Sequence, residues 1–132
     1  MRPAVMEKAR ILVVDDEAHV RELLKDFLER KGYAVSTAPD GAEALSAVQE
    51  QKPQLVLLDV RMPGMDGLET LRRIRAVDRT VGVIMLTALH DEDIAKEAMR
   101  REAYDYVTKP VSLRYLELAV LTRLAQAERS VG

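Results

Sequence analysis

Four short groups of polar residues follow apolar runs in this 132-residue chain, and their side chains are of types that can handle a metal cation and a phosphoryl group. Asp15 and Asp16 follow Ile-Leu-Val-Val, and Asp59 follows Leu-Val-Leu-Leu. Thr87 follows Val-Ile-Met-Leu, and Lys109 follows Asp-Tyr-Val-Thr. Ligand sites of open α/β sheets lie beyond the carboxyl ends of the strands. If the apolar runs are neighbouring parallel strands, these side chains meet at one edge of one sheet.

Three carboxylates in a shared pocket repel one another, which raises their pKa values and destabilises the fold unless a cation compensates. Mg²⁺ is the natural cation, because it prefers oxygen ligands and typically takes one or two carboxylates together with phosphate oxygens. A polar turn at the end of a strand is the alternative interpretation of Asp15 and Asp16, since Asp is common in turns. Their expected convergence with Asp59 favours the metal site.

The elements that must position these residues alternate along the chain. Strands are predicted over residues 10–14, 33–38, 55–58, 81–86 and 104–108, and a helix follows each strand. Apolar residues recur at helical spacing in the helices. The positions predicted to face inward are Val20, Leu23, Leu24, Phe27, Leu28, Ala42, Leu45, Val48, Leu68, Leu71, Ile74, Val77, Ile94, Ala98, Met99, Leu113, Leu116, Val120 and Leu124.

This alternation predicts an α/β fold, a single doubly wound (βα)5 flavodoxin-like domain with a five-stranded parallel sheet in the order 2-1-3-4-5. We expect a flexible N-terminal lead-in over residues 1–9 and one domain over residues 10–128. The formal net charge of −2 provides no overall attraction to nucleic acid or anionic lipid. The absence of Cys excludes disulfides and thiolate metal sites, and no apolar run has the length of a membrane span, so we predict a cytoplasmic protein.

The chain resembles the receiver domain of bacterial two-component response regulators, the CheY-like family, over nearly its whole length. The matching segments cover residues 13–17, 57–67, 86–88 and 105–110. Each segment is a modest signal, but all four in order and at family-like spacing are highly specific.

The resemblance implies that Asp59 accepts a phosphoryl group from the phosphohistidine of a histidine kinase. A carboxylate is an established covalent nucleophile, and phosphoryl transfer needs mainly positioning and charge neutralisation. By the same resemblance, Asp16 and Asp59 bind Mg²⁺ together with the backbone carbonyl of Arg61, and Asp15 acts mostly through an intervening water. The domain would assist its own phosphorylation and slow hydrolysis without being a turnover enzyme.

The resemblance also assigns roles to residues around the phosphoryl group. Lys109 and the hydroxyl of Thr87 would each contact a phosphoryl oxygen, and a cis peptide bond between Lys109 and Pro110 would aim the ammonium into the pocket. After phosphorylation, Thr87 would shift toward the new oxygens and Tyr106 would rotate inward into the vacated space.

The partners implied are a sensor histidine kinase or phosphotransfer protein and a downstream output domain or partner protein, with a homodimer as a further option. The output surface would lie on the fourth helix, fifth strand and fifth helix, without contact of this domain to nucleic acid or membrane. Exposed residues expected there are Arg100, Arg101, Tyr115 and Leu118, although a solvated face is the favoured interpretation of each of them taken singly. Two positions depart from the common family pattern: Glu102 replaces a Gly, and Val111 replaces a Phe.

Three other functions are disfavoured by particular residues. A Mg²⁺-dependent phosphatase with an aspartyl nucleophile would usually carry a second Asp at the position of Arg61. A flavin- or nucleotide-binding module would need a first loop rich in Gly, Ser or Thr, and the acidic run from Asp15 to Glu17 would repel phosphate there. A scaffold that has lost phosphorylation would not need the complete set of Asp16, Asp59, Thr87 and Lys109.

Overall fold

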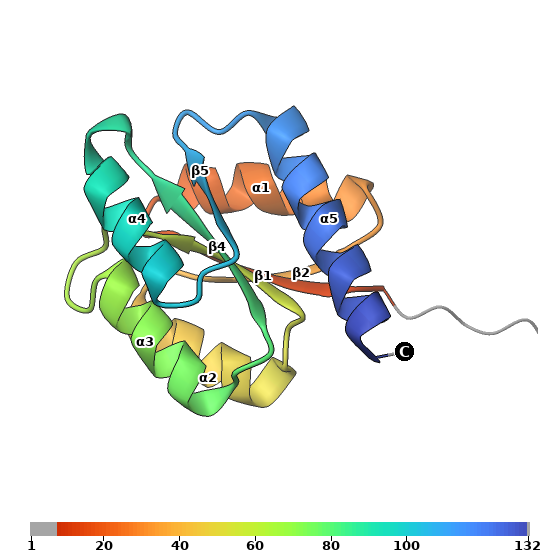
Figure 1. Cartoon of the computed structure of the whole chain (residues 1–132). Helices are drawn as coiled ribbons and strands as arrows, with labels where there is room; N and C mark the ends of the chain where they lie inside the picture. Colours follow the sequence, from red (N-terminus) through yellow and green to blue (C-terminus); the bar gives the residue numbers. More distant parts are fainter. Residues whose placement is uncertain (1–7, 132) are drawn as a thin grey trace, which may run out of the picture.

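The computed structural model describes residues 8–131, without the side chains of Leu89 and residues 128–131, so most of the predicted lead-in over residues 1–9 lies outside the described part. Strands and α-helices alternate along the chain (Figure 1). The elements are β1 (Arg10–Val14), α1 (Ala18–Arg30), β2 (Ala34–Ala38), α2 (Gly41–Gln51), β3 (Leu55–Asp59), α3 (Gly67–Val77), β4 (Gly82–Thr87), the 3-10 turn η1 (Leu89–Asp91), α4 (Glu92–Arg100), β5 (Asp105–Thr108) and α5 (Leu113–Val131).

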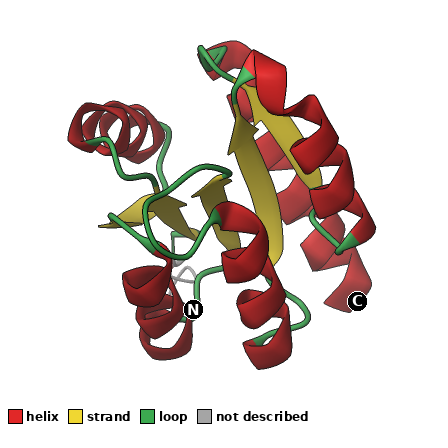
Figure 2. Cartoon of the chain, turned by 90° about the vertical axis from the view of Figure 1, so that its left-hand side faces the viewer, coloured by secondary structure: helices red, strands yellow, loops and turns green. Residues whose placement is uncertain are grey.

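The five strands form one parallel sheet in the order β2-β1-β3-β4-β5, which confirms the predicted fold class and strand order. Helices α1 and α5 cover one face, and α2, α3 and α4 cover the other (Figures 1 and 2). Strands β3 and β4 are buried along their whole length. A parallel strand covered on both faces needs a continuous apolar run, which is the pattern these strands carry.

Two hydrophobic clusters fill the space between the sheet and its helices. Leu24 and Leu28 of α1 and Leu116 of α5 pack on one face. Leu71 and Ile74 of α3 pack on the other, together with apolar residues of α2 and α4. The two clusters hold both faces of the sheet, so the ends of its strands are fixed relative to one another.

Several residues predicted to face the core are exposed instead. Leu23 is 54% exposed, Val77 46% and Met99 39%, and Ala42 lies on the outer side of α2. Each lies at the margin of the apolar stripe of its helix. The width of the buried stripe depends on how each helix packs on the sheet, which helical spacing does not specify.

The turn before β5 has a left-handed backbone at Glu102. Glu102 has a φ of 71°, a conformation that favours residues without a Cβ. Its carbonyl accepts hydrogen bonds from Nε and Nη2 of Arg75, at 3.2 and 2.7 Å. These contacts hold the turn in its left-handed conformation.

Strand register brings the polar groups together at the carboxyl edge of the sheet. Val14, the last residue of β1, pairs with Leu58 of β3, and Asp59 pairs with Leu86 of β4. Thr87 pairs with Thr108, the last residue of β5. The residues that follow these strand ends therefore lie side by side. Along the described part of the chain, none of the helices combines the length and apolar character that crossing a membrane requires.

Candidate functional site

Asp15, Asp59 and Lys109 form the centre of the site at the carboxyl edge of the sheet. Lys109 Nζ lies 2.9 Å from Asp15 Oδ2 and 3.4 Å from Asp59 Oδ2. Asp15 is fully buried and Asp59 is 5% exposed, so one ammonium contacts two buried carboxylates. Glu17 Oε1 lies a further 3.8 Å from the same nitrogen, at the mouth of the site. The ammonium therefore neutralises only part of the negative charge around it.

Local hydrogen bonds orient both buried carboxylates. The backbone N–H of Glu17 donates to Asp15 Oδ1 at 2.9 Å, and the backbone N–H of Arg61 donates to Asp59 Oδ1 at 3.3 Å. Arg21 holds the turn after β1, because its Nη1 donates to the backbone carbonyl of Asp15 at 2.7 Å. Short loops directly after β1 and β3 thus fix the directions of the carboxyl groups.

The pKa of Asp59 is raised to about 7, first by burial and then by the nearby charge of Asp15. The Lys109 ammonium and the Arg61 N–H act in the opposite direction but do not compensate. Burial opposes the charge of Lys109, yet its hydrogen bond to Asp15 and the charge of Asp59 leave the Lys109 pKa above its usual value. The site is thus short of positive charge, and an added cation would stabilise the ionised form of Asp59.

The donor set fits a hard divalent cation. Carboxylate oxygens of Asp15, Asp16 and Glu17 lie within 4.8 Å of one another, and Asp16 and Glu17 face solvent. Asp59 joins this acidic group through its shared contact with Lys109. Oxygen donors, one of them buried and two of them open to water, suit Mg²⁺, which keeps several waters when it binds.

Thr87 lies on β4, next to the strand of Asp59, and Tyr106 lies on β5, one strand further out. Thr87 is fully buried, and its hydroxyl lies 3.2 Å from the carbonyl of Ala88 and 3.3 Å from that of Asp91. Tyr106 is half-buried on β5, against the cluster that contains the α3 and α4 side chains. The peptide bond between Lys109 and Pro110 is cis, as the family resemblance implies.

The loop after Asp59 approaches the end of β3 closely at Gly67. A Cβ at Gly67 would lie 2.4 Å from the carbonyl oxygen of Asp59 and 2.7 Å from the Cα of Val60. The N–H of Gly67 donates to the Val60 carbonyl at 2.8 Å, and Asp66 caps α3 by accepting from the N–H of Glu69. A residue without a side chain is therefore required where the loop folds back on the Asp59 backbone.

Two features of the site have no counterpart in the sequence-based prediction. Glu17 lies beside the Lys109 ammonium, although the sequence only indicated that it repels phosphate. Asp91, which is 2% exposed, accepts hydrogen bonds from the Arg61 side chain, although only the Arg61 carbonyl was expected to take part. Asp91 lies in an acidic stretch typical of a helix start, so no sequence signal identified it.

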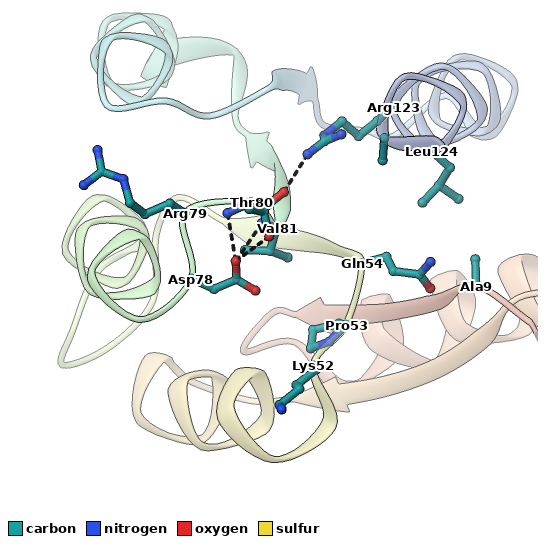
Figure 3. Close-up of a pocket in the computed structure, with 11 residues that line it drawn as sticks. Ala9, Lys52, Pro53, Gln54, Asp78, Arg79, Thr80, Val81, Arg123 and Leu124 are labelled. Carbon is teal, nitrogen blue, oxygen red and sulfur yellow. Dashed lines mark hydrogen bonds between the residues drawn. The ribbon is translucent and has the colours of Figure 1, made fainter. Parts of the chain in front are cut away.

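A second hollow lies at the opposite edge of the sheet and contains none of these groups. This open pocket of about 710 Å³ is lined by residues that precede β3 and β4 and by the end of α5 (Figure 3). Its polar groups bond locally: Asp78 accepts from Thr80 and from the Val81 N–H, and Arg123 donates to the Thr80 carbonyl. The polar groups of this pocket stabilise the loop before β4, and the chemistry of the chain is concentrated at the other edge.

Residues 11–121 match the family model described as the response regulator receiver domain. The chain is 42% identical over 123 residues to the transcriptional regulatory protein ResD of Bacillus subtilis, covering 93% of this chain and 51% of that protein. It is 36% identical over 115 residues to sporulation initiation phosphotransferase F of Bacillus subtilis, covering 87% of this chain and 93% of that protein. The chain thus spans about half the length of relatives such as ResD and nearly all of the shorter one.

Solved structures match the fold over nearly all of the chain. A response regulator receiver domain protein from Clostridium thermocellum has a TM-score of 0.88 at 34% identity, covering 91% of this chain and 97% of that one. A CheY-like receiver domain protein from Methanospirillum hungatei has a TM-score of 0.89 at 28% identity, covering 94% of this chain and 99% of that one. Sequence and structure comparisons therefore point to one family.

Proposed function

The chain belongs to the response regulator receiver domain family, the phosphoacceptor modules of two-component signal transduction, and we propose that Asp59 is its phosphoacceptor. The donor would be the phosphohistidine of a sensor histidine kinase or of a phosphotransfer protein. One observation carries this assignment: Asp59 is a buried carboxylate at the end of a central strand, next to a second buried carboxylate and a single ammonium. As a member of this family, the chain is a signalling module rather than a turnover enzyme.

The chemistry proposed for Asp59 is an in-line transfer. A carboxylate oxygen of Asp59 forms a bond to phosphorus while the bond from phosphorus to the donor imidazole nitrogen breaks, and the imidazole leaves with the electron pair of that bond. The contacts of Asp59 with the Arg61 N–H and the Lys109 ammonium hold the carboxylate in one orientation before the donor arrives. Holding the nucleophile in place is the main contribution a protein makes to this reaction.

Mg²⁺ is the proposed cofactor, held by Asp15, Asp16 and Asp59 with the backbone carbonyl of Arg61. When bound, it supplies positive charge that offsets the carboxylates and the phosphoryl oxygens. The support from the structure is the acidic group around Asp15 and the raised pKa of Asp59, both of which indicate too little positive charge. Glu17 at the mouth of the site adds to the attraction for a cation.

Lys109 and Thr87 are the proposed partners of the phosphoryl oxygens. The Lys109 ammonium already lies between the buried carboxylates, so it is close to any group added to Asp59. Thr87 directly follows Leu86, the residue paired with Asp59, so its hydroxyl is on the neighbouring strand end. Because that hydroxyl donates toward the Ala88 and Asp91 carbonyls, Thr87 has to turn before it donates to a phosphoryl oxygen.

The same turn of Thr87 is the proposed start of the output signal. Movement of Thr87 vacates space beside β5, and Tyr106, half-buried there, rotates inward to fill it. The change is transmitted to a surface formed by α4, β5 and α5, where Tyr115 and Leu118 are exposed. The partner at this surface is an output domain, a separate protein or a second copy of the chain, without direct contact of this domain to nucleic acid. A cytoplasmic location stays a prediction.

Incubation with acetyl phosphate and Mg²⁺, followed by intact-mass measurement, tests the assignment of Asp59. We expect the mass to increase by one phosphoryl group, and we expect Asp59→Asn and the addition of EDTA each to abolish the increase. Asp66→Asn is the matched control, because Asp66 lies in the same loop and Asn caps a helix as well as Asp. Absence of labelling, or labelling that survives Asp59→Asn, would reject the proposal.

A further inference from the structure

A bidentate pair between Arg61 and Asp91 joins the two loops that border the proposed phosphoryl pocket. Arg61 Nε and Nη2 donate to the Asp91 carboxylate at 2.9 and 2.7 Å, across 30 residues of sequence. Two parallel hydrogen bonds between a guanidinium and a carboxylate fix orientation as well as distance. Asp91 is 2% exposed, so removal of Arg61 would leave a buried carboxylate beside the exposed imidazole of His90, whose Nε2 lies 3.7 Å from Asp91 Oδ1.

The pair is connected to Asp59 at one end and to Thr87 at the other. The backbone N–H of Arg61 donates to Asp59, and the backbone carbonyl of Asp91 lies 3.3 Å from the Thr87 hydroxyl. A second carbonyl, that of Ala88, lies 3.2 Å from the same hydroxyl. A threonine hydroxyl has a single proton to donate. That proton is therefore directed toward the loop after β4 and away from Asp59.

The packing on the Arg61 side of the pair is open. A small pocket of about 130 Å³ lies beside the pair, lined by residues that include Met62 of the loop after β3 and Ile94 of α4. The packing between this loop and α4 is therefore incomplete next to Arg61. Arg61 lines this pocket and Asp91 accepts its guanidinium, so loss of the pair would remove a side-chain restraint on the loop that carries Asp91.

We propose that Asp91, fixed by Arg61, is a positioning residue that holds the Thr87 hydroxyl in its turned-away arrangement. The pair opposes the turn of Thr87 toward a phosphoryl group on Asp59, and its strength sets how readily the domain is phosphorylated. This role rests on the proposed function of Asp59 and deepens it, because it assigns a regulator of the Thr87 step that lies outside the set of residues expected to contact the phosphoryl group.

The rate of phosphorylation by acetyl phosphate with Mg²⁺ tests the proposal in Asp91→Asn and Arg61→Gln. Asp91→Asn removes a negative charge and Arg61→Gln removes a positive one, so a purely electrostatic effect on an anionic donor would change the two rates in opposite directions. If each substitution releases Thr87, both variants should be phosphorylated about fivefold faster than the unsubstituted domain. A factor of about five is at the lower end of the coupling usually found between two sites. The double variant should react no faster than either single variant, because both remove the same contact.

Two further variants separate positioning from a general structural effect. In a Thr87→Val background, which keeps the shape of residue 87 without a hydroxyl, Asp91→Asn should have no effect on the rate. Glu97→Gln is the matched control, because it removes a carboxylate of α4 that pairs with Arg100 and Arg101 away from the pocket, and its rate should match that of the unsubstituted domain.

The possible results also separate this inference from the function on which it rests. If the unsubstituted domain is not labelled, or Asp59→Asn is labelled, the proposed function itself fails. If labelling depends on Asp59 but Asp91→Asn or Arg61→Gln reacts less than about twofold faster, the positioning role is overturned. The positioning role is also overturned if Asp91→Asn still accelerates phosphorylation in the Thr87→Val background, or if Glu97→Gln accelerates it to the same extent.

Discussion

Asp59→Asn removes a charge that destabilises the folded domain, so the variant should be more stable than the unsubstituted domain at neutral pH. The pKa of Asp59 is about 7 in the folded domain, compared with 3.8 for an ordinary Asp. Between these values the folded state binds more protons than the unfolded chain, so the Asp59 contribution to stability falls as the pH rises. Because Asn does not titrate, the advantage of the variant is near zero well below the unfolded pKa of 3.8 and grows to its full value above pH 7.

The size of this advantage follows from the two pKa values. At about 1.4 kcal/mol for each tenfold difference in proton affinity, the rise from 3.8 to about 7 sets a ceiling of about 4 kcal/mol. The pocket is open at the side of Lys109, which is 22% exposed, and solvent screening there reduces the effect. We therefore expect Asp59→Asn to raise the free energy of unfolding by about 2 kcal/mol at pH 8.

Urea unfolding in EDTA at pH 4.5 and pH 8 measures the effect. With an m-value of about 2 kcal/mol/M, the midpoint of Asp59→Asn at pH 8 should lie about 1 M above that of the unsubstituted domain. At pH 4.5, which is still above the unfolded pKa of 3.8, the difference should fall to about half, about 0.5 M. Asp66→Asn, at an exposed position of the same loop, is the matched control for a substitution of Asp by Asn. Equal midpoints at pH 8, or the same gain at both pH values, would refute the electrostatic explanation.

Further predictions concern the cation balance and the backbone around the site. Lys109→Met leaves two buried carboxylates without their ammonium, so it should lower the free energy of unfolding by about 2 kcal/mol at pH 8 and less at pH 5, measured by urea unfolding. Mg²⁺ at 100 times its Kd should raise the free energy of unfolding of the unsubstituted domain by about 2.7 kcal/mol, and that of Asp59→Asn by less. Equal increases in the two proteins would show that the ion binds away from Asp59. Gly67→Ala should lower the free energy of unfolding by more than about 2 kcal/mol, measured by thermal unfolding, because the added Cβ meets the backbone of Asp59. Gly64→Ala should lower it by about 1 kcal/mol, because Gly64 has a φ of 78° but free space around it. Glu102→Gly should raise the free energy of unfolding by about 0.5 kcal/mol by relieving its left-handed backbone, and a lower stability would show that the contacts with Arg75 outweigh that strain.

The fold and the location of the site were predictable because both depend on local patterns. Continuous apolar runs identified buried parallel strands, and their alternation with helical periodicity left few topologies. Once the strand order was known, Asp15, Asp59 and Lys109 had to lie at one edge, since the carboxyl ends of parallel strands point the same way. The structure agrees with the strand order and the convergence.

The failures of the sequence analysis concern quantities that packing decides. Leu23 and Met99 are apolar and correctly spaced for the core, yet both are exposed, because the contact area of each helix limits the buried stripe. The raised pKa of Asp59 likewise depends on how much water the folded pocket excludes and on one carboxylate contributed by another strand. Neither value is a property of a sequence segment.

Short-range patterns in the chain predict strand direction and strand order, and therefore place acids, a hydroxyl and an ammonium at the carboxyl edge of a parallel sheet. How these groups share their charges follows from the three-dimensional arrangement of the loops. The Lys109 ammonium contacts the carboxylates of both Asp15 and Asp59, and the Arg61 guanidinium donates a hydrogen bond to Asp91, in a loop 30 residues away. Such pairings depend on loop conformations and distances of a few ångströms between separate segments, which hydrophobic periodicity does not encode.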